Sequence, residues 1–143
     1  MNVATLRLID AWVGVPVCFA LTGWRKLTSL FSRASDGPIE RILFVKLAEQ
    51  GSTVLAHAAI REAVDRVGRE NVRFLVFEEN RPILDAMDLV PEENVVVVKA
   101  KRLWKTPFSI LGALWTLRRL KLDAAIDLEF YARSTAILTY LSK

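Results

Sequence analysis

The sequence predicts an α/β protein: a Rossmann-like parallel sheet with flanking helices, preceded by an N-terminal hydrophobic helix. Three observations lead to this fold class. After residue 38, short β-rich apolar runs recur four times, each suited to a buried strand. Segments with apolar residues at helical spacing follow each run. An uncharged run precedes them near the N-terminus. Strands that alternate with helices form a parallel sheet through right-handed crossovers.

The first strand is expected at residues 41–46 (RILFVK), and a helix at 53–67 follows from apolar positions such as Val54, Ala58 and Ala63. A second strand at 72–77 (VRFLVF) leads into a short helix at 80–89, where Pro82 is tolerated in the first turn. The remaining elements are a strand at 94–99, a helix at 108–120 after Pro107, a strand at 124–128 and a helix at 131–141.

Four strands are few for a doubly wound domain, which commonly has five or six. We therefore expect residues 39–143 to be a partial domain, from a truncated sequence or a split gene. The polar segment 32–38 (SRASDGP) is the predicted linker, and residues 1–31 form a separate hydrophobic segment.

The N-terminal segment is predicted to associate with a membrane. Residues 11–24 carry no charge, but this run is shorter than the roughly twenty residues that a spanning helix needs. Trp12 and Trp24 bracket it at positions suited to lipid headgroups, and Pro16 predicts a kink within it. Arg25 and Lys26 form a basic flank that favours the cytoplasmic face of the inner membrane. The alternative is an N-terminal helix packed on the protein's own core.

Composition narrows the chemistry. The chain has 143 residues, one cysteine and one histidine, which excludes a disulfide framework and argues against a zinc centre. No metal is therefore expected. Seven basic residues and no acidic residue lie between Lys99 and Lys121, interleaved with aromatic residues. This run is either a solvated face or a contact for anionic lipid or a polyanionic substrate. No nucleic-acid-binding module accompanies it.

Candidate site residues lie where strands end, because ligands of open α/β sheets bind at the carboxyl ends of strands. In the first loop (LAEQGS), Gly51 permits close backbone approach, and Ser52 or Thr53 is expected to cap the next helix. This loop is either an anion site or a plain capping turn. Glu49 is a candidate general base, or merely solvated, and His57 is expected to be packed or exposed.

The fourth strand ends in carboxylates. Asp127 lies within the apolar run, so its side chain needs a partner, for which Arg133 is one candidate. The functional alternative is that Glu129 and Arg133 face the sheet crevice and hold a sugar or a phosphate. Both interpretations stay open at this stage.

Two blocks resemble the lipopolysaccharide heptosyltransferase family, glycosyltransferase family nine. The first is ILFVKLAEQGSTVLAHAAIREAV, with Lys46 at the end of the strand and Gly51-Ser52 where the family has Gly-Asp. The second is LRRLKLDAAIDLEFYARSTAILTYL, similar to the family's segment of apolar residues, Ile-Asp-Leu and Arg-Ser. Its matching positions are Asp123, Ile126, Asp127, Leu128, Arg133 and Ser134.

The resemblance implies the N-terminal half of a GT-B fold, in which two Rossmann-like domains face each other across a cleft. It implies metal-independent, inverting transfer of a sugar, often heptose from ADP-heptose, to a lipid-linked cell-envelope glycan. The N-terminal domain would bind the acceptor through Lys46, Gly51, Thr53, Glu129 and Arg133, and a C-terminal domain absent here would bind the nucleotide sugar. No other cofactor is expected.

One position departs from the family. Ser52 stands where the family's aspartate supplies the proposed catalytic base, and serine cannot take a proton at neutral pH without a base of its own. Glu49 in the same loop is the candidate replacement. The alternative to an enzyme is a non-catalytic, membrane-associated α/β binding module.

Overall fold

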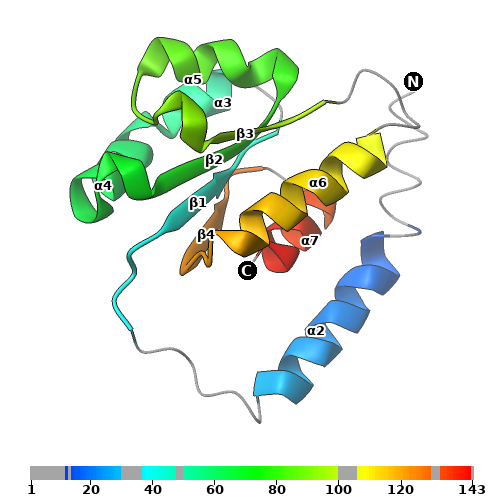
Figure 1. The fold of residues 1–143 in the computed structure, drawn as a ribbon. Helices are drawn as coiled ribbons and strands as arrows, with labels where there is room; N and C mark the ends of the chain where they lie inside the picture. Colours follow the sequence, from blue (N-terminus) through cyan, green and yellow to red (C-terminus); the bar gives the residue numbers. More distant parts are fainter. Residues whose placement is uncertain are drawn as a thin grey trace.

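The computed structural model describes residues 12, 14–29, 37–47, 50–99, 106–129 and 133–142. Its centre is a sheet of four parallel strands in the order β3-β2-β1-β4 (Figure 1). The strands are β1 (Ile42–Val45), β2 (Val72–Phe77), β3 (Val95–Val98) and β4 (Ala124–Asp127). The predicted Rossmann-like parallel sheet is therefore confirmed, with each strand within a residue or two of its expected bounds.

Helices cover both faces of the sheet (Figure 1). The helices are α2 (Val15–Ser29), α3 (Gln50–Leu55), α4 (His57–Val67), α5 (Arg81–Met87), α6 (Thr106–Arg119) and α7 (Arg133–Leu141). Of these, α4 and α5 cover one face of the sheet, and α6 and α7 cover the other. Short 3₁₀ turns, η2 (Arg69–Asn71), η3 (Glu78–Asn80) and η4 (Glu92–Asn94), join several of them to strands.

Alternation along the strands divides the core into two clusters, because successive side chains of a strand point to opposite faces. On one face, Phe44 and Phe74 stack with ring centroids 6.1 Å apart beneath Ile60 of α4 and Leu84 of α5. On the other face, the buried residues include Leu43, Val45, Leu75, Ala113 of α6, Leu117 of α6 and Leu138 of α7. The central strands β1 and β2 are thus buried from both sides, as is usual in parallel sheets, whereas β3 and β4 at the edges are only partly buried.

The single helix predicted over residues 53–67 is wrong in one respect. The segment forms two helices, α3 and α4, with a turn at Ala56 between them. The amide of Ala56 is shared between the carbonyls of Ser52 and Thr53, at 3.1 and 3.2 Å. Gly51, Thr53 and Val54 have low helix propensity, which is consistent with a short first helix that does not run on.

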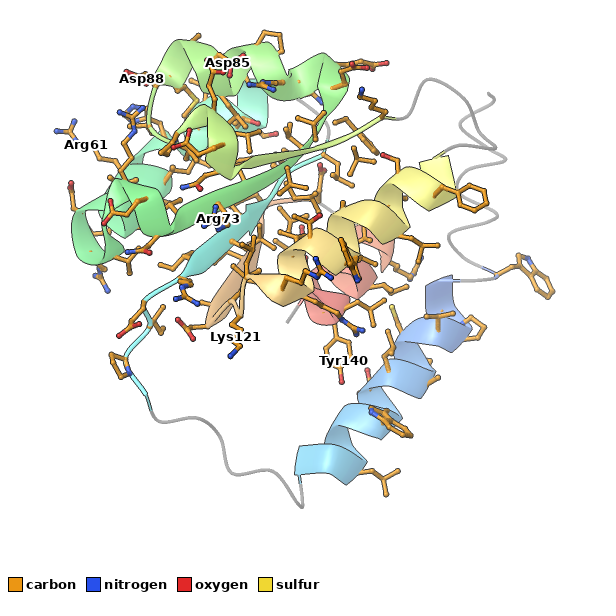
Figure 2. The ribbon with its side chains drawn as sticks, viewed as in Figure 1. Arg61, Arg73, Asp85, Asp88, Lys121 and Tyr140 are labelled. Carbon is orange, nitrogen blue, oxygen red and sulfur yellow. The ribbon has the colours of Figure 1, made fainter. Side chains whose placement is uncertain are left out.

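At the amino end of the sheet, Arg73 of β2 donates to Oδ1 of the buried Asn94. Asn94 in turn donates to the carbonyl of Glu70 at 2.9 Å, so this pair joins η2 to η4. Burial lowers the pKa of Arg73, Arg41 lowers it further, and Glu93 opposes the shift. Arg73 is labelled in Figure 2, on the sheet and away from the strands' carboxyl ends.

Helix α2 lies outside the core described so far. It packs against α7, and neither core cluster contains an α2 residue among those described. Pro16 is the second residue of α2, and Trp12 and Gly14 just before this helix have π-helical backbone. The kink predicted at Pro16 stays a prediction.

Candidate functional site

The sheet has a topological switch point between β1 and β4. From β1 the chain moves outward to β2 and β3, with α4 and α5 on one face. It then crosses back through α6 to place β4 on the other side of β1, with α6 and α7 on the opposite face. Ligands of such sheets bind at the carboxyl ends of the strands beside this reversal. The candidate site is therefore the edge where β1 and β4 end.

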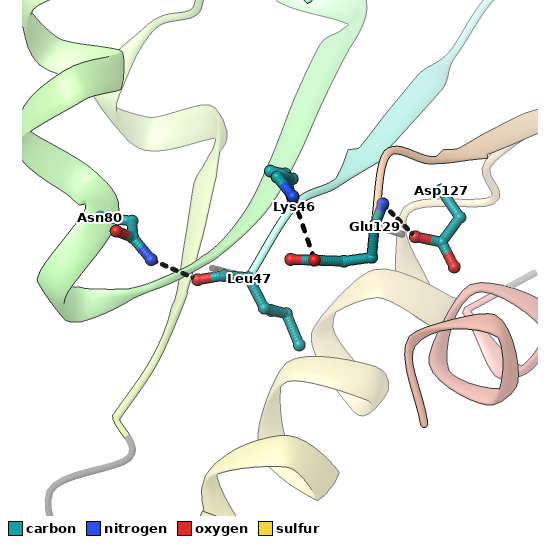
Figure 3. A network of polar contacts seen from close by, with 5 residues as sticks. All are labelled: Lys46, Leu47, Asn80, Asp127 and Glu129. Carbon is teal, nitrogen blue, oxygen red and sulfur yellow. Dashed lines mark hydrogen bonds and ion pairs between the residues drawn. The ribbon is translucent and has the colours of Figure 1, made fainter. Parts of the chain in front are cut away.

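An ion pair joins the two strands at that edge. Lys46 directly follows β1, and its Nζ lies 3.0 Å from Oε2 of Glu129, which follows β4 (Figure 3). The lysine side chain is fully buried, and the glutamate side chain is 9% exposed. Moving two such charges out of water costs several kcal/mol per ion, so each needs the other. The structure thus brings together two of the residues that the sequence singled out separately.

The backbone fixes the position of this pair. Val45 lies opposite Asp127 in the parallel register, and the amide of Leu128 donates to the carbonyl of Val45 at 2.9 Å, just beyond the strand. The amide of Glu129 then donates to Oδ1 of Asp127 at 2.9 Å. This local hydrogen bond turns the chain so that Glu129 faces Lys46. The contact found for Asp127 is therefore local, where the sequence had suggested Arg133.

Asn80 links the end of a third strand, β2, to the same edge through a hydrogen bond. Its Nδ2 donates to the carbonyl of Leu47 at 2.6 Å, linking the end of η3 after β2 to the loop after β1 (Figure 3). The amide of Phe77 donates to the same carbonyl at 3.4 Å. Asn80 was not among the residues predicted from the sequence. An asparagine soon after a strand is a signal for such a contact, because its side chain often binds backbone groups in turns.

The loop after β1 is described only in part. Glu49, the candidate base, lies outside the described residues. Gly51 is exposed in α3, and no atom lies within 4 Å of where its Cβ would be. Ser52 is half-buried and Thr53 is buried, both inside a helix that begins at Gln50. The predicted cap at Ser52 or Thr53 is therefore wrong, because an N-cap residue precedes the first helical residue.

The other predicted residues lie near the same edge or on helices beside it. Arg133 is the first residue of α7 and is exposed. His57 is the first residue of α4 and is half-buried. Among the described residues, no three His, Cys, Asp or Glu side chains lie close enough together to hold a metal ion.

The predicted membrane residues lie on or beside α2. Trp12 and Trp24 are 78% and 66% exposed, and Pro16 and Lys26 are exposed as well. The backbone of Arg25 is helical, but its side chain lies outside the described residues. No helix in the described parts of the chain has the length and apolar character needed to cross a membrane.

Two hollows lie away from the ion pair. A cavity of about 250 Å³ between α2 and α7 is lined by Cys18, Leu21, Thr22, Ala136, Ile137 and Tyr140. Tyr140 points from α7 toward α2 in Figure 2. A second hollow lies between α6 and α7, beside Leu111 and Trp115. Both are mainly apolar and neither includes Lys46 or Glu129. The site is thus assigned from topology and buried charge, not from cavity size.

Comparison with known proteins finds no matching family model, no similar curated protein and no similar solved structure.

Proposed function

We propose that this chain is the acceptor-side part of a glycosyltransferase related to family nine, that is, the N-terminal half of a GT-B fold. In this proposal it holds a lipid-linked cell-envelope glycan at the cytoplasmic face of the inner membrane. A second domain outside this chain would bind the nucleotide sugar, such as ADP-heptose. The observation that carries the proposal is the ion pair between Lys46 and Glu129 at the switch point.

The position of the two resembling blocks supports this proposal. They occupy residues 42–64 and 117–141, so β2, α5 and β3 all lie between them in sequence. In the folded chain, β1 of the first block pairs directly with β4 of the second. Lys46 of the first block and Glu129 of the second therefore meet at one sheet edge, where an α/β protein binds its ligand.

The chemistry of the pair suits a sugar acceptor. An ionised carboxylate accepts several hydrogen bonds, and sugar hydroxyls are donors suited to a carboxylate such as that of Glu129. Lys46 keeps the carboxylate in place, and its burial prevents the ammonium from turning away to solvent. In this role the pair orients the acceptor and takes no part in bond making.

The proposed transfer needs a base near the acceptor hydroxyl. As the hydroxyl oxygen attacks the anomeric carbon, its proton passes to a carboxylate, and the nucleoside diphosphate leaves with the electrons of the broken C–O bond. Glu49 is our candidate for that carboxylate, because Ser52 stands where the resembling family has aspartate. The loop that carries Glu49 follows Lys46, so the base would lie beside the orienting pair.

Acceptor binding by the chain itself tests the proposal. Isotope-labelled protein would be titrated with lipid-linked glycans extracted from bacterial envelopes in detergent micelles, with matched micelles that lack glycan as the control. We expect glycan-dependent changes in the NMR signals of Gly51, Thr53 and Glu129. Signals that change only in α2, and equally in both micelles, would contradict glycan binding and favour the rival interpretation, a membrane-associated module without catalysis.

A further inference from the structure

Helix α6 presents large apolar side chains to solvent. Phe108, Leu111 and Trp115 are 76%, 61% and 59% exposed. Their spacing of three and four residues places them in one stripe along the helix. Helices of soluble proteins normally carry polar residues on the face turned away from the core, so this stripe needs an explanation.

The opposite face of α6 packs into the core and is enough to hold the helix on the sheet. Ala113 and Leu117 are buried in the second core cluster, with Ile110 and Leu114 packed beside them. The outward stripe therefore contributes nothing to the core. A helix that is apolar on both faces is expected when both faces are covered, and the described part of the chain covers only one.

Every charge on α6 is basic. Arg118 and Arg119 lie in its last turn and are exposed, and no acidic residue occurs between Thr106 and Arg119. The guanidinium of Arg119 lies 3.3 Å above the Trp115 ring. Lys121 lies two residues beyond the end of the helix and is also exposed (Figure 2). The stripe thus combines apolar side chains with a positive end, which complements a surface that is apolar inside and anionic outside.

Other occupants fit these features less well. A dimer formed through this stripe around a two-fold axis would place the basic end of α6 from both copies in the same contact. Helix α6 has no acidic residue to pair with these charges. An acidic protein would match the charge but would leave Phe108 and Leu111 in need of an apolar groove. Anionic lipid satisfies both requirements at once.

Helix α2 presents a second surface of the same kind. Phe19, Trp24 and Leu27 are 76%, 66% and 62% exposed, and Lys26 lies among them. Both α2 and α6 contact α7, and both lie on the same side of the sheet (Figure 1). We propose that the outward face of α6 binds an anionic membrane surface and, with α2, forms a two-helix membrane contact.

This contact gives the candidate site a position relative to the lipid. Helix α6 connects β3 to the parallel strand β4, so it runs against the strands and begins at their carboxyl ends. Its first turn, with Phe108, is therefore at the edge that holds the ion pair. Membrane bound along α6 reaches that edge. This consequence rests on the proposed acceptor role, whereas membrane binding by α6 does not.

Vesicle binding by the whole chain tests the proposal. The variant Phe108→Ser/Leu111→Ser/Trp115→Ser would be compared with wild type on phosphatidylcholine vesicles with and without phosphatidylglycerol. Burial of any one of these side chains in lipid is expected to raise the affinity more than about tenfold. We therefore expect the triple variant to bind the anionic vesicles at least roughly tenfold more weakly than wild type. Arg119→Gln, which removes one positive charge, should weaken binding to anionic vesicles about fivefold and leave binding to neutral vesicles unaffected.

A matched control uses exposed apolar residues elsewhere. Val54 and Leu55 are 49% and 85% exposed on α3, whose partners lie on the other side of the sheet. The variant Val54→Ser/Leu55→Ser should bind vesicles like wild type. Because all these side chains are exposed, circular dichroism should be unchanged in every variant.

Three results would overturn the proposal. The triple variant could bind as wild type while Trp24→Ser/Leu27→Ser releases the protein, which would make α2 the whole contact. Wild type could fail to bind anionic vesicles at all. It could also form a dimer without lipid that the triple variant abolishes, which would make the stripe a contact between copies. None of these results bears on glycan binding, which the NMR titration measures separately.

Discussion

The Nζ of Lys46 and the Oε2 of Glu129 lie 3.0 Å apart, although the two residues are 83 positions apart in sequence. The backbones of β1 and β4 are paired along the strands, and this side-chain contact links the two chains just beyond the strand ends. It can form only after the crossover through α6 has brought β4 beside β1. The ion pair therefore depends on the strand order of the sheet. The ion pair in turn holds the charged side chains at this edge in place.

Removing Glu129 is expected to destabilise the fold strongly. Glu129→Ala leaves the ammonium of Lys46 fully buried without its carboxylate, and loss of one partner from a buried pair costs about 3–5 kcal/mol. Lys46→Met/Glu129→Leu removes both charges and should recover most of that free energy. Chemical denaturation monitored by circular dichroism would measure both.

The exposed pair of Arg66 and Glu62 provides the comparison. Its side chains are 72% and 60% exposed, so Glu62→Ala should lower the free energy of unfolding by no more than about 0.5 kcal/mol. A Glu129→Ala variant as stable as Glu62→Ala would show that Lys46 finds solvent or another acceptor, and would remove the pair from our account of the site.

Asp123 is expected to hold the start of β1 against β4. Its Oδ2 accepts hydrogen bonds from the amides of Glu40 and Arg41, at 3.0 and 2.9 Å. Hydrogen bonds to a charged group contribute more than neutral ones, so Asp123→Ala should cost about 2 kcal/mol of unfolding free energy. Asp123→Asn keeps one acceptor oxygen and should cost less. Asp65→Ala, an exposed change on α4, should stay within about 0.5 kcal/mol of wild type.

Asp123 is also one of the positions that carry the family resemblance. If Asp123→Ala lowers the free energy of unfolding but its folded molecules bind glycan like wild type, the role of Asp123 is structural alone. Equal stability of Asp123→Ala and wild type would contradict the contribution of these two amide contacts.

Gly68 is expected to resist substitution. It ends α4 with φ 87° and ψ 147°, a backbone conformation that is nearly restricted to glycine. Gly68→Ala should lower stability by about 1–3 kcal/mol because of this strain, since the nearby Glu70 side chain can move aside. Gly112 in α6 is the matched control, with no atom within 4 Å of its Cβ position.

At Gly112 the opposite sign is expected. Gly112→Ala should raise the free energy of unfolding by about 0.5–1 kcal/mol, because alanine loses less backbone entropy in a helix. Thermal melting of the two variants side by side gives the contrast. If both substitutions shifted the melting temperature equally and in the same direction, backbone conformation would not explain the effect at either glycine.

Local patterns predicted the strands well because apolar β-rich runs such as VRFLVF are distinctive, and their alternation with helices implies the parallel sheet. Lys46 was predicted as a site residue from the family resemblance, and Glu129 from its place at the end of the fourth predicted strand. Their pairing was not predicted, because the strand order depends on how crossovers pack and not on any local signal. The same holds for Asn80, whose acceptor on Leu47 is 33 residues away.

The expected cap at Ser52 or Thr53 failed for a different reason. Helix ends depend on competing turn geometries within one or two residues, and here the helix begins at Gln50 and stops again at Leu55. This error and the division of the predicted helix at 53–67 into α3 and α4 both concern helix boundaries.

Glu49→Gln is expected to abolish most turnover in a protein that includes the donor-binding domain. A positioned general base contributes about 10²–10⁴-fold to the rate, and glutamine cannot take the acceptor's proton. Acceptor binding should change little, because it depends on Lys46 and Glu129 in our proposal. Steady-state transfer of a labelled sugar to lipid-linked glycan gives kcat, and the NMR titration gives acceptor affinity.

Ser52 supplies both the control and a rescue. Ser52→Ala should leave kcat nearly unchanged, because the serine hydroxyl is not a base at neutral pH. Glu49→Gln/Ser52→Asp restores a carboxylate at the position where the resembling family has one, and should regain part of the lost rate. Unchanged turnover in Glu49→Gln would remove Glu49 from the mechanism. A large loss in Ser52→Ala would instead point to a hydroxyl contact with the acceptor, since α3 places Ser52 within one turn of Gly51 and Thr53.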